Sequence, residues 1–250
     1  MSETFTPETP KVSPAATVPI AMAGSPYQFK LADPYSSHSV ILSLLPQSGN
    51  ERILDVGAAH GYLAATLRRR GFHVTGIEAD PVLAEEAAHH CHELHVADLD
   101  GPLPSFGARF DVILYGDVLE HLRDPMAVFT CLNQSLRPDG IVIVSLPNIA
   151  NLYIRVHLLM GRFDYADRGI LDRTHLHFFT RKTFRSFLDH AGLDVLQLTA
   201  TPIPLPLIVP ERWHGRPLTA AHSVNAWMAS HWMTMFGYQF VAVARMRGHA

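Results

Sequence analysis

The sequence predicts an α/β fold built on a mostly parallel sheet, and three observations support it. Apolar runs of strand length alternate with helical segments along the 250-residue chain, the order that covers both faces of a parallel sheet with helices. The first apolar run ends in Asp-Val-Gly at 55–57 and turns directly into a helical segment. Acidic residues follow three later strand ends, at 78, 98 and 117. Because the carboxyl ends of parallel strands meet at one edge, we expect the ligand site at this edge.

The turn after the first strand is built from small residues. Gly57, Ala58, Ala59 and Gly61 let a ligand approach the backbone, and the helix that begins near Gly61 directs its free N–H groups and positive dipole end at the same place. Asp55 adds a carboxylate, which suits a ligand that carries both a carboxylate and a cation. Dinucleotide sites use Gly-x-Gly-x-x-Gly, whereas this turn has only two glycines, so the pattern fits a dinucleotide less well.

The next two strand ends carry groups suited to a nucleoside. Glu78 follows the strand 73–77, about twenty residues after the turn, and is placed to hold the two hydroxyls of a ribose. Asp98 follows a third strand, where its carboxylate can accept a hydrogen bond from an adenine amino group while Leu99 packs on the ring. The acid at 78 fits either a dinucleotide or another adenosine cofactor.

At these motifs the chain resembles class I S-adenosylmethionine-dependent methyltransferases. LDVGAAHGYLA at 54–64 resembles their first motif, GDVLEHLRDP at 116–125 their fourth-strand motif, and LRPDGIVIVSLPN at 136–148 their fifth strand. GRFDYADRGILDRTHLHFFTRKTF at 161–184, with DPYSSHSVIL at 33–42, resembles the bacterial branch grouped as methyltransferase type 23. The resemblance spans 27–247. It departs from the family pattern at Ala58-Ala59, where many relatives have Cys-Gly, and at His177, where Arg is expected.

The resemblance implies a Rossmann-like, seven-stranded, mostly parallel sheet with a final antiparallel strand, a lid insertion after the fifth strand, and S-adenosylmethionine as the cofactor. The late strands are expected at 195–201 and 238–246, and the segments 149–179 and 202–236 are the expected caps over the substrate. On the matched motifs, the residues expected to bind the cofactor are Tyr27, His38, Asp55, Gly57, Ala58, Glu78, Ala79, Asp98, Leu99, Gly116 and Asp117.

Methyl transfer requires alignment of the nucleophile with the methyl group and, for a hydroxyl or amine, removal of a proton. His121 follows the fourth strand and His175 lies in the polar insertion, and both are candidate bases because histidine titrates near neutral pH. Each has an alternative role. His121 can order the cofactor loop, and His175 can join Asp172 and Arg173 in an ion-pair network that closes the lid. The expected acceptor contacts are Tyr165, Arg173 and His177.

Capping residues predict where the helices begin. Asp80 precedes a helix over 81–91, Asp124 precedes one that stops before Pro138, and Thr180 caps one that ends at Gly192. Within 202–236, a proline-rich loop precedes a helix with Trp227 and Trp232, whose spacing suggests an apolar face. This helix either covers the sheet, closes over the substrate or forms the surface of a homodimer.

Composition predicts one soluble, cytoplasmic domain over 26–250. The 48% hydrophobic content can fill its core, and residues 1–25 read as a disordered tail with no signal-peptide pattern. The sequence has no run of about 20 apolar residues that could span a membrane, and its two cysteines cannot make a disulfide framework. The net charge of −3 and a single basic triple at 68–70 predict no nucleic-acid partner. Adjacent histidines at 89, 90, 92 and 95 lack a cysteine pair, so we expect no metal site.

The predicted function is therefore methyl transfer to a small-molecule acceptor, such as a hydroxyl or amine of a sugar or natural product. Three alternatives stay open on the sequence alone. The same sulfonium cofactor can undergo alkyl transfer or internal cyclisation; a nicotinamide-dependent oxidoreductase can use a similar turn; and the fold can bind its cofactor without chemistry. The missing middle glycine disfavours the oxidoreductase.

Overall fold

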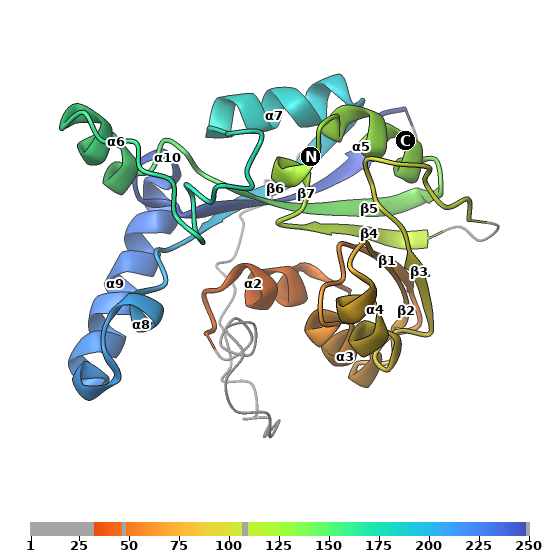
Figure 1. The fold of residues 1–250 in the computed structure, drawn as a ribbon, viewed down its shortest axis with the longest axis horizontal. Coiled ribbons are helices and arrows are strands. Elements are labelled where there is room, and N and C mark those ends of the chain that lie inside the picture. Colours follow the sequence, from red (N-terminus) through yellow and green to blue (C-terminus); the bar gives the residue numbers. More distant parts are fainter. Residues whose placement is uncertain (1–32, 47–48, 107–109, 249–250) are drawn as a thin grey trace, which may run out of the picture.

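A computed structural model describes residues 33–46, 49–106 and 110–248 of the chain. Their strands form one seven-stranded sheet in the order β3-β2-β1-β4-β5-β7-β6 (Figure 1). Strands β1 to β5 pair in parallel, whereas β7 runs antiparallel to both β5 and β6. This confirms the predicted mostly parallel sheet with a final antiparallel strand. The strands are β1 Arg52–Val56, β2 His73–Glu78, β3 Glu93–Val96, β4 Phe110–Gly116, β5 Leu136–Pro147, β6 Leu193–Thr201 and β7 Gln239–Met246.

Helices cover both faces of the sheet. Alternate residues of β1 point to opposite sides, so Leu54 and Val56 enter the core under α5 and α7, while Ile53 enters the core under α2 and α3. Figure 1 shows α5 and α7 on one side of the sheet and α2, α3 and α4 on the other. The helices are α2 Ser37–Leu44, α3 Tyr62–Arg69, α4 Pro81–Ala88, α5 Pro125–Asn133, α6 Leu152–Leu159, α7 Arg181–His190, α8 Leu205–Ile208, α9 Arg216–His231 and α10 Met233–Phe236, with short 3-10 helices at Leu119–His121 and Glu211–Trp213.

The three predicted helix caps are confirmed. The side chains of Asp80 and Asp124 accept backbone N–H bonds at the beginnings of α4 and α5. Thr180 forms a capping box with Thr183 at the beginning of α7. The α4 helix ends at Ala88, three residues before the predicted end. The predicted disordered tail 1–25 and Tyr27 lie outside the described residues.

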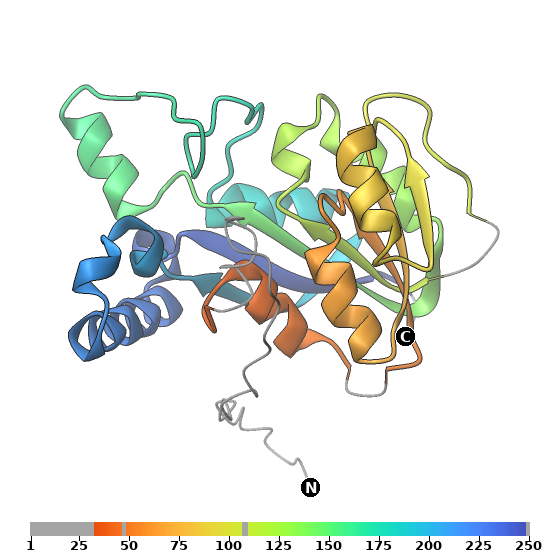
Figure 2. The same cartoon turned by 60° about the horizontal axis from the view of Figure 1, so that its bottom comes forward.

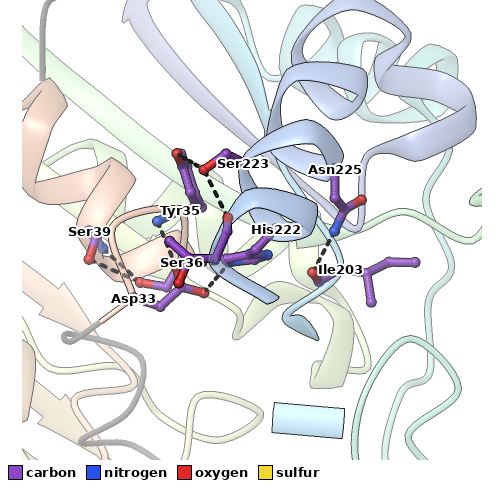
Figure 3. Close-up of polar contacts among 9 residues, drawn as sticks. Asp33, Tyr35, Ser36, Ser39, Ile203, His222, Ser223 and Asn225 are labelled. Carbon is purple, nitrogen blue, oxygen red and sulfur yellow. Dashed lines mark hydrogen bonds and ion pairs between the residues drawn. The ribbon is translucent and has the colours of Figure 1, made fainter. Parts of the chain in front are cut away.

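Helices α6 and α8 to α10 extend past one end of the sheet, and α9 packs on β6 (Figure 2). The helix expected within 202–236 thus covers part of the sheet, one of the three alternatives, but its tryptophans are not on the buried face. The buried residues of α9 are His222, Asn225 and Ala229, whereas Trp227 and Trp232 are more than half exposed. The inward polar groups have partners: Asn225 donates to the Ile203 carbonyl, and His222 pairs with Asp33 ahead of α2 (Figure 3). Hydrogen bonding thus permits a polar inner face, and the tryptophans lie outside.

Every helix in the described part of the chain is too short or too polar to cross a lipid bilayer. Both cysteines are free thiols: Cys91 is buried, and Cys131 is exposed on α5.

Candidate active site

The turn between β1 and α3 has the tight geometry that its small residues predict. Gly57 and Gly61 both have left-handed backbone angles, with φ of 77° and 75°. A Cβ atom on Gly57 would lie 2.9 Å from the Val118 side chain, so only glycine leaves room between this turn and the loop after β4. Helix α3 begins after Gly61 without a side-chain cap, so its N-terminus faces this turn directly. The N–H of Ala58 donates to the Ile77 carbonyl and holds the turn against β2.

Asp55 is a buried carboxylate beneath this turn. Asp55 is only 3% exposed, and its Oδ2 atom has no hydrogen-bond partner within the described residues. Burial, and secondly the charge of Glu78, raise the pKa of Asp55 to about 7. A ligand cation at this edge would satisfy the Oδ2 atom and favour the ionised form, so the residue fits the predicted cofactor.

Glu78 already holds three backbone donors at the end of β2. Its Oε2 accepts from Ala59 N at 2.8 Å, and its Oε1 accepts from Ala79 N at 2.8 Å and Asp80 N at 2.9 Å. A carboxylate offers about four acceptor sites, so one remains for a ligand hydroxyl. Glu78 therefore ties the β1–α3 turn to the loop after β2, a structural role that the sequence did not predict.

Asp98 and Leu99 differ in their surroundings. Asp98 is exposed, and its Oδ1 accepts from Asp100 N at 2.9 Å, which fixes the loop after β3. Leu99 is only 7% exposed and packs in the core under α5. Contact of Leu99 with the adenine ring stays a prediction.

The loop after β4 brings three elements together. Asp117 has φ of 56°, and its carboxylate accepts from Ser145 on β5 at 2.5 Å and from Ser37 on α2 at 3.3 Å. Gly116 before it has no atom within 4 Å of the position of a Cβ, so the space beside it is open. His38 lies in the first turn of α2, next to Ser37. The loop that contains Gly116 and Asp117 therefore lies beside the β1 turn, and the cofactor contacts of Gly116, Asp117 and His38 stay predictions.

His121 lies at the end of the short helix that follows this loop. Its Nδ1 is 2.9 Å from the Thr174 hydroxyl, which itself donates to Asp172 Oδ1 at 2.7 Å. Burial, and then the neighbouring His175, lower the pKa of His121, while Asp172, Thr174 and Asp117 act in the opposite direction. A lowered pKa keeps this imidazole neutral at neutral pH, the form that can accept a proton.

His175 is buried against His121, with ring centroids 4.7 Å apart. Its Nδ1 contacts the Ile170 carbonyl at 3.1 Å, so this nitrogen carries the proton, and Nε2 lies 3.9 Å from Glu120 Oε1. The Glu120 carbonyl accepts from the backbone N–H groups of Leu176 and His177 and so joins the insertion to the loop after β4. The two candidate bases, which lie 54 positions apart in sequence, thus come together.

The donor atoms of Glu120, His121 and His175 all lie within 4.8 Å of one another. Two imidazoles and a carboxylate are ligand types that can hold a divalent cation. The sequence predicts no metal, and that expectation stays a prediction for this cluster. The histidines at 89, 90, 92 and 95 are not among the metal-type groups found in the described residues.

The predicted acceptor contacts all lie on the insertion but are not gathered at one point. Tyr165 is 53% exposed, and Arg173 is paired with Asp167 at 2.7 Å. His177 Nε2 lies 3.3 Å from the Arg123 carbonyl, so the ring joins the insertion to the loop before α5. The predicted network of Asp172, Arg173 and His175 is wrong, because Arg173 pairs with a different carboxylate and His175 faces Glu120.

Two neighbours of the candidate bases were not predicted. Thr174 lies directly before His175 in the sequence Asp-Arg-Thr-His at 172–175, and a hydroxyl between charged and titratable residues is the feature that indicates a polar contact there. Tyr238 is half-buried just before β7 and close to the insertion, since a Cβ on Gly169 would lie 2.9 Å from its hydroxyl. Burial, and then Asp117 and Asp172, raise the pKa of Tyr238 to about 12, so its hydroxyl is a donor and not a base.

A family model described as a methyltransferase domain matches residues 31–198. The chain belongs to this methyltransferase family. It is an S-adenosylmethionine-dependent methyltransferase, and this result replaces the alternative of a nicotinamide-dependent oxidoreductase. The ubiquinone biosynthesis O-methyltransferase of Pasteurella multocida (strain Pm70) is 26% identical over 227 residues, covering 79% of this chain and 85% of the relative. The enzyme of that name from Xylella fastidiosa (strain M23) is 30% identical over 183 residues, covering 70% and 71%.

Solved structures share the fold of this methyltransferase. A TehB-like SAM-dependent methyltransferase from Corynebacterium glutamicum aligns with a TM-score of 0.54 at 18% identity, over 88% of this chain and 95% of that one. A second, from Mesorhizobium loti, aligns with a TM-score of 0.56 at 19% identity, over 82% and 95%. At these identities the likeness concerns the fold, so the acceptor has to be inferred from the site.

Proposed function

We propose that this methyltransferase methylates a hydroxyl oxygen of a small organic acceptor, bound between the loop 116–121 and the insertion 149–179. The observation that carries the proposal is the position of His121, which lies at the edge where the cofactor motifs end and is joined to the insertion through Thr174; burial, which lowers its pKa, supports the role of a base. S-adenosylmethionine supplies an electrophilic methyl group on its sulfonium. The protein has to align the acceptor oxygen and remove its proton.

The cofactor is held, in this proposal, by groups at four strand ends. Asp55 and the uncapped N-terminus of α3 receive the ammonium and carboxylate of the amino-acid part, because they offer the complementary charges. Glu78 accepts from the ribose through its remaining acceptor site, and Asp98 accepts from the adenine amino group. Gly57 and Gly116 leave the backbone open beside them.

His121 is the proposed base. Its Nε2 takes the proton of the acceptor hydroxyl, the oxygen electron pair forms the new C–O bond, and the electron pair of the broken C–S bond stays on sulfur. His175 is less suited to this role, because it is buried and its Nε2 faces Glu120. We assign it instead to packing against the His121 ring, at the centroid distance of 4.7 Å.

Two observations support a small acceptor with an apolar part. The relatives are named O-methyltransferases of ubiquinone biosynthesis, which favours oxygen as the methylated atom. A groove of about 410 Å³ lies between α6 and α9–α10, lined mostly by apolar side chains that include Val156, Met160, Ile203, Met228 and Phe236. Its residues follow the ends of β5 and β6, at the same edge of the sheet as the cofactor motifs.

The proposal is tested by two parallel incubations with bacterial extract. One uses cofactor labelled in the methyl group and the other uses cofactor labelled in the carboxyl group. The expected result is a low-molecular-weight product that carries only the methyl label, on oxygen. Carboxyl label in the product would show alkyl transfer, and cofactor loss without any labelled acceptor would show internal cyclisation. Label in protein or nucleic acid, or on nitrogen, would contradict the proposed acceptor class.

A further inference from the structure

Asp172 and Thr174 of the insertion form a hydrogen-bonded chain that ends on the proposed base. Thr174 Oγ1 lies 2.7 Å from Asp172 Oδ1 and 2.9 Å from His121 Nδ1. The same Asp172 oxygen accepts from the Thr174 backbone N–H at 2.9 Å, which holds the two residues in one rigid turn. The chain therefore links His121, after β4, to residues more than 50 positions later in the sequence.

The chemistry of Asp172, Thr174 and His121 determines which atom donates in each of these two hydrogen bonds. An ionised carboxylate can only accept, so the single hydroxyl proton of Thr174 goes to Asp172. The Thr174 oxygen is then left to accept, and His121 Nδ1 has to be the protonated nitrogen of the neutral ring. Consequently the lone pair of the neutral imidazole is on Nε2, the nitrogen that a general base needs free.

We infer that Asp172 and Thr174 are positioning residues, which hold His121 in the Nδ1–H tautomer with Nε2 free to accept the proton of the acceptor. This inference rests on the proposed function of His121 as the base. The residues act through His121 and do not touch the reacting atoms.

An intervening hydroxyl has a different effect from a direct carboxylate contact. Direct pairing with Asp172 would favour the charged imidazolium, which cannot accept a proton. The Thr174 hydroxyl between them orients the ring and keeps the Asp172 carboxylate out of direct contact with it. The other titratable groups around His121 are His175, which lowers its pKa, and Asp117, which raises it, with the Glu120 carboxylate beside both rings. Together they leave the imidazole neutral under conditions in which Asp172 is ionised.

The test compares three variants of the two positioning residues, Thr174 and Asp172. Thr174→Val keeps the shape but removes the acceptor for Nδ1–H, Thr174→Ser restores the hydroxyl, and Asp172→Asn keeps an acceptor oxygen but removes the charge. Thr219→Val, an exposed threonine on α9, is the matched control. The readouts are turnover against pH with methyl-labelled cofactor, and nitrogen NMR of His121, which reports its tautomer and pKa without any acceptor.

Thr174→Val should lower turnover roughly tenfold or more at every pH and raise the share of the Nε2–H tautomer. Thr174→Ser and Thr219→Val should stay within about twofold of the wild type. Asp172→Asn should retain the tautomer and shift the acid limb of the pH profile to lower pH, because a negative charge near His121 is lost.

Two results would overturn the inference in distinguishable ways. If His121→Asn abolishes turnover but Thr174→Val leaves the tautomer, the pH profile and turnover unchanged, the base is correct and the positioning role is wrong. If His121→Asn retains turnover, the proposed base is wrong. Asp172 and Thr174 would then hold a ring that takes no proton, and their positioning role in catalysis would be wrong as well.

Discussion

Asp33 and His222, 189 positions apart in the sequence, form a buried pair that joins the segment before α2 to α9. His222 Nε2 lies 3.1 Å from both carboxylate oxygens of Asp33, and the two residues are 5% and 6% exposed. Tyr35 packs edge-on against the His222 ring and contacts the Ser223 hydroxyl (Figure 3). The pair thus connects the two segments that approach the active-site edge from opposite ends of the chain.

Asp33→Asn should lower the free energy of unfolding by about 2 kcal/mol, since a buried hydrogen bond to a charged acceptor is worth about 1.5–3 kcal/mol. Urea unfolding at constant pH measures the loss. Tyr35→Phe is the control, because its hydroxyl contact of 3.3 Å is exposed and its loss should cost less than about 0.5 kcal/mol. Equal losses in the two variants would show that the pair contributes little beyond local packing.

Asp55 should make stability depend on pH. Its folded pKa of about 7 lies above the ordinary value of 3.8, so the folded protein binds the proton more tightly than the unfolded chain. The stabilisation is complete below about pH 4 and is lost as pH rises to 7, with an upper bound of about 4 kcal/mol. Asp55→Asn should flatten this part of the curve in urea unfolding measured from pH 4 to 8. If the free energy of unfolding of the wild type rises from pH 4 to 8, and that of Asp55→Asn changes in parallel, the raised pKa of Asp55 is contradicted.

Glu78→Ala should weaken binding of S-adenosylhomocysteine at least tenfold in calorimetry, because both the proposed ribose contact and the tie to Ala59 N are lost. Glu78→Ala should also be less stable to urea, because three backbone N–H groups lose their acceptor. Glu78→Gln should be intermediate in stability, since its single amide oxygen can accept from only one side of these backbone donors and its NH2 group cannot accept. Unchanged affinity in the alanine variant would reject the ribose role.

His121→Asn should lower turnover by about 10²- to 10⁴-fold with acceptor binding retained, the range typical of a lost general base. In the wild type, turnover should rise with pH through a midpoint below the ordinary histidine value of 6.5, because only the neutral ring accepts a proton. Rapid-quench kinetics ensures that the chemical step is measured. Retention of more than about a third of wild-type turnover would favour alignment alone.

Dialysis against a chelator distinguishes base catalysis from metal catalysis at the same cluster. A protein that uses His121 as a base should keep its turnover, and elemental analysis should find no stoichiometric divalent ion. Loss of activity that Mn²⁺ or Zn²⁺ restores would instead assign Glu120, His121 and His175 as ligands.

Arg173→Ala and Tyr165→Ala should raise the acceptor KM or lower turnover while the affinity for S-adenosylhomocysteine changes little, because both residues lie on the insertion after β5. Loss of the exposed Arg173–Asp167 pair should cost less than about 1 kcal/mol of stability. Arg185→Ala on α7 is the control for removal of a surface charge. A parallel loss of cofactor affinity would make the insertion a lid over the cofactor.

The sequence by itself determined the alternation of strands and helices, the helix caps and the cofactor turn. These features depend on neighbouring residues: apolar runs of strand length, a capping side chain and glycines that accept left-handed backbone angles. The acids at strand ends were predictable for a similar reason, since parallel strands place consecutive carboxyl ends at one edge.

Tertiary structure alone decided which polar groups meet. Burial of Asp55, the backbone donors on Glu78 and the contact of His121 with Thr174 each depend on elements far apart in the chain, so no local spacing encodes them. The same holds for α9, where the sequence pattern indicated an apolar face but not which side of the helix packs on the sheet. His222 and Asn225 lie inside instead, because Asp33 and the Ile203 carbonyl satisfy their hydrogen bonds there. Such partners are known only once the chain has folded, and they decide whether a buried polar side chain stabilises or destabilises the structure.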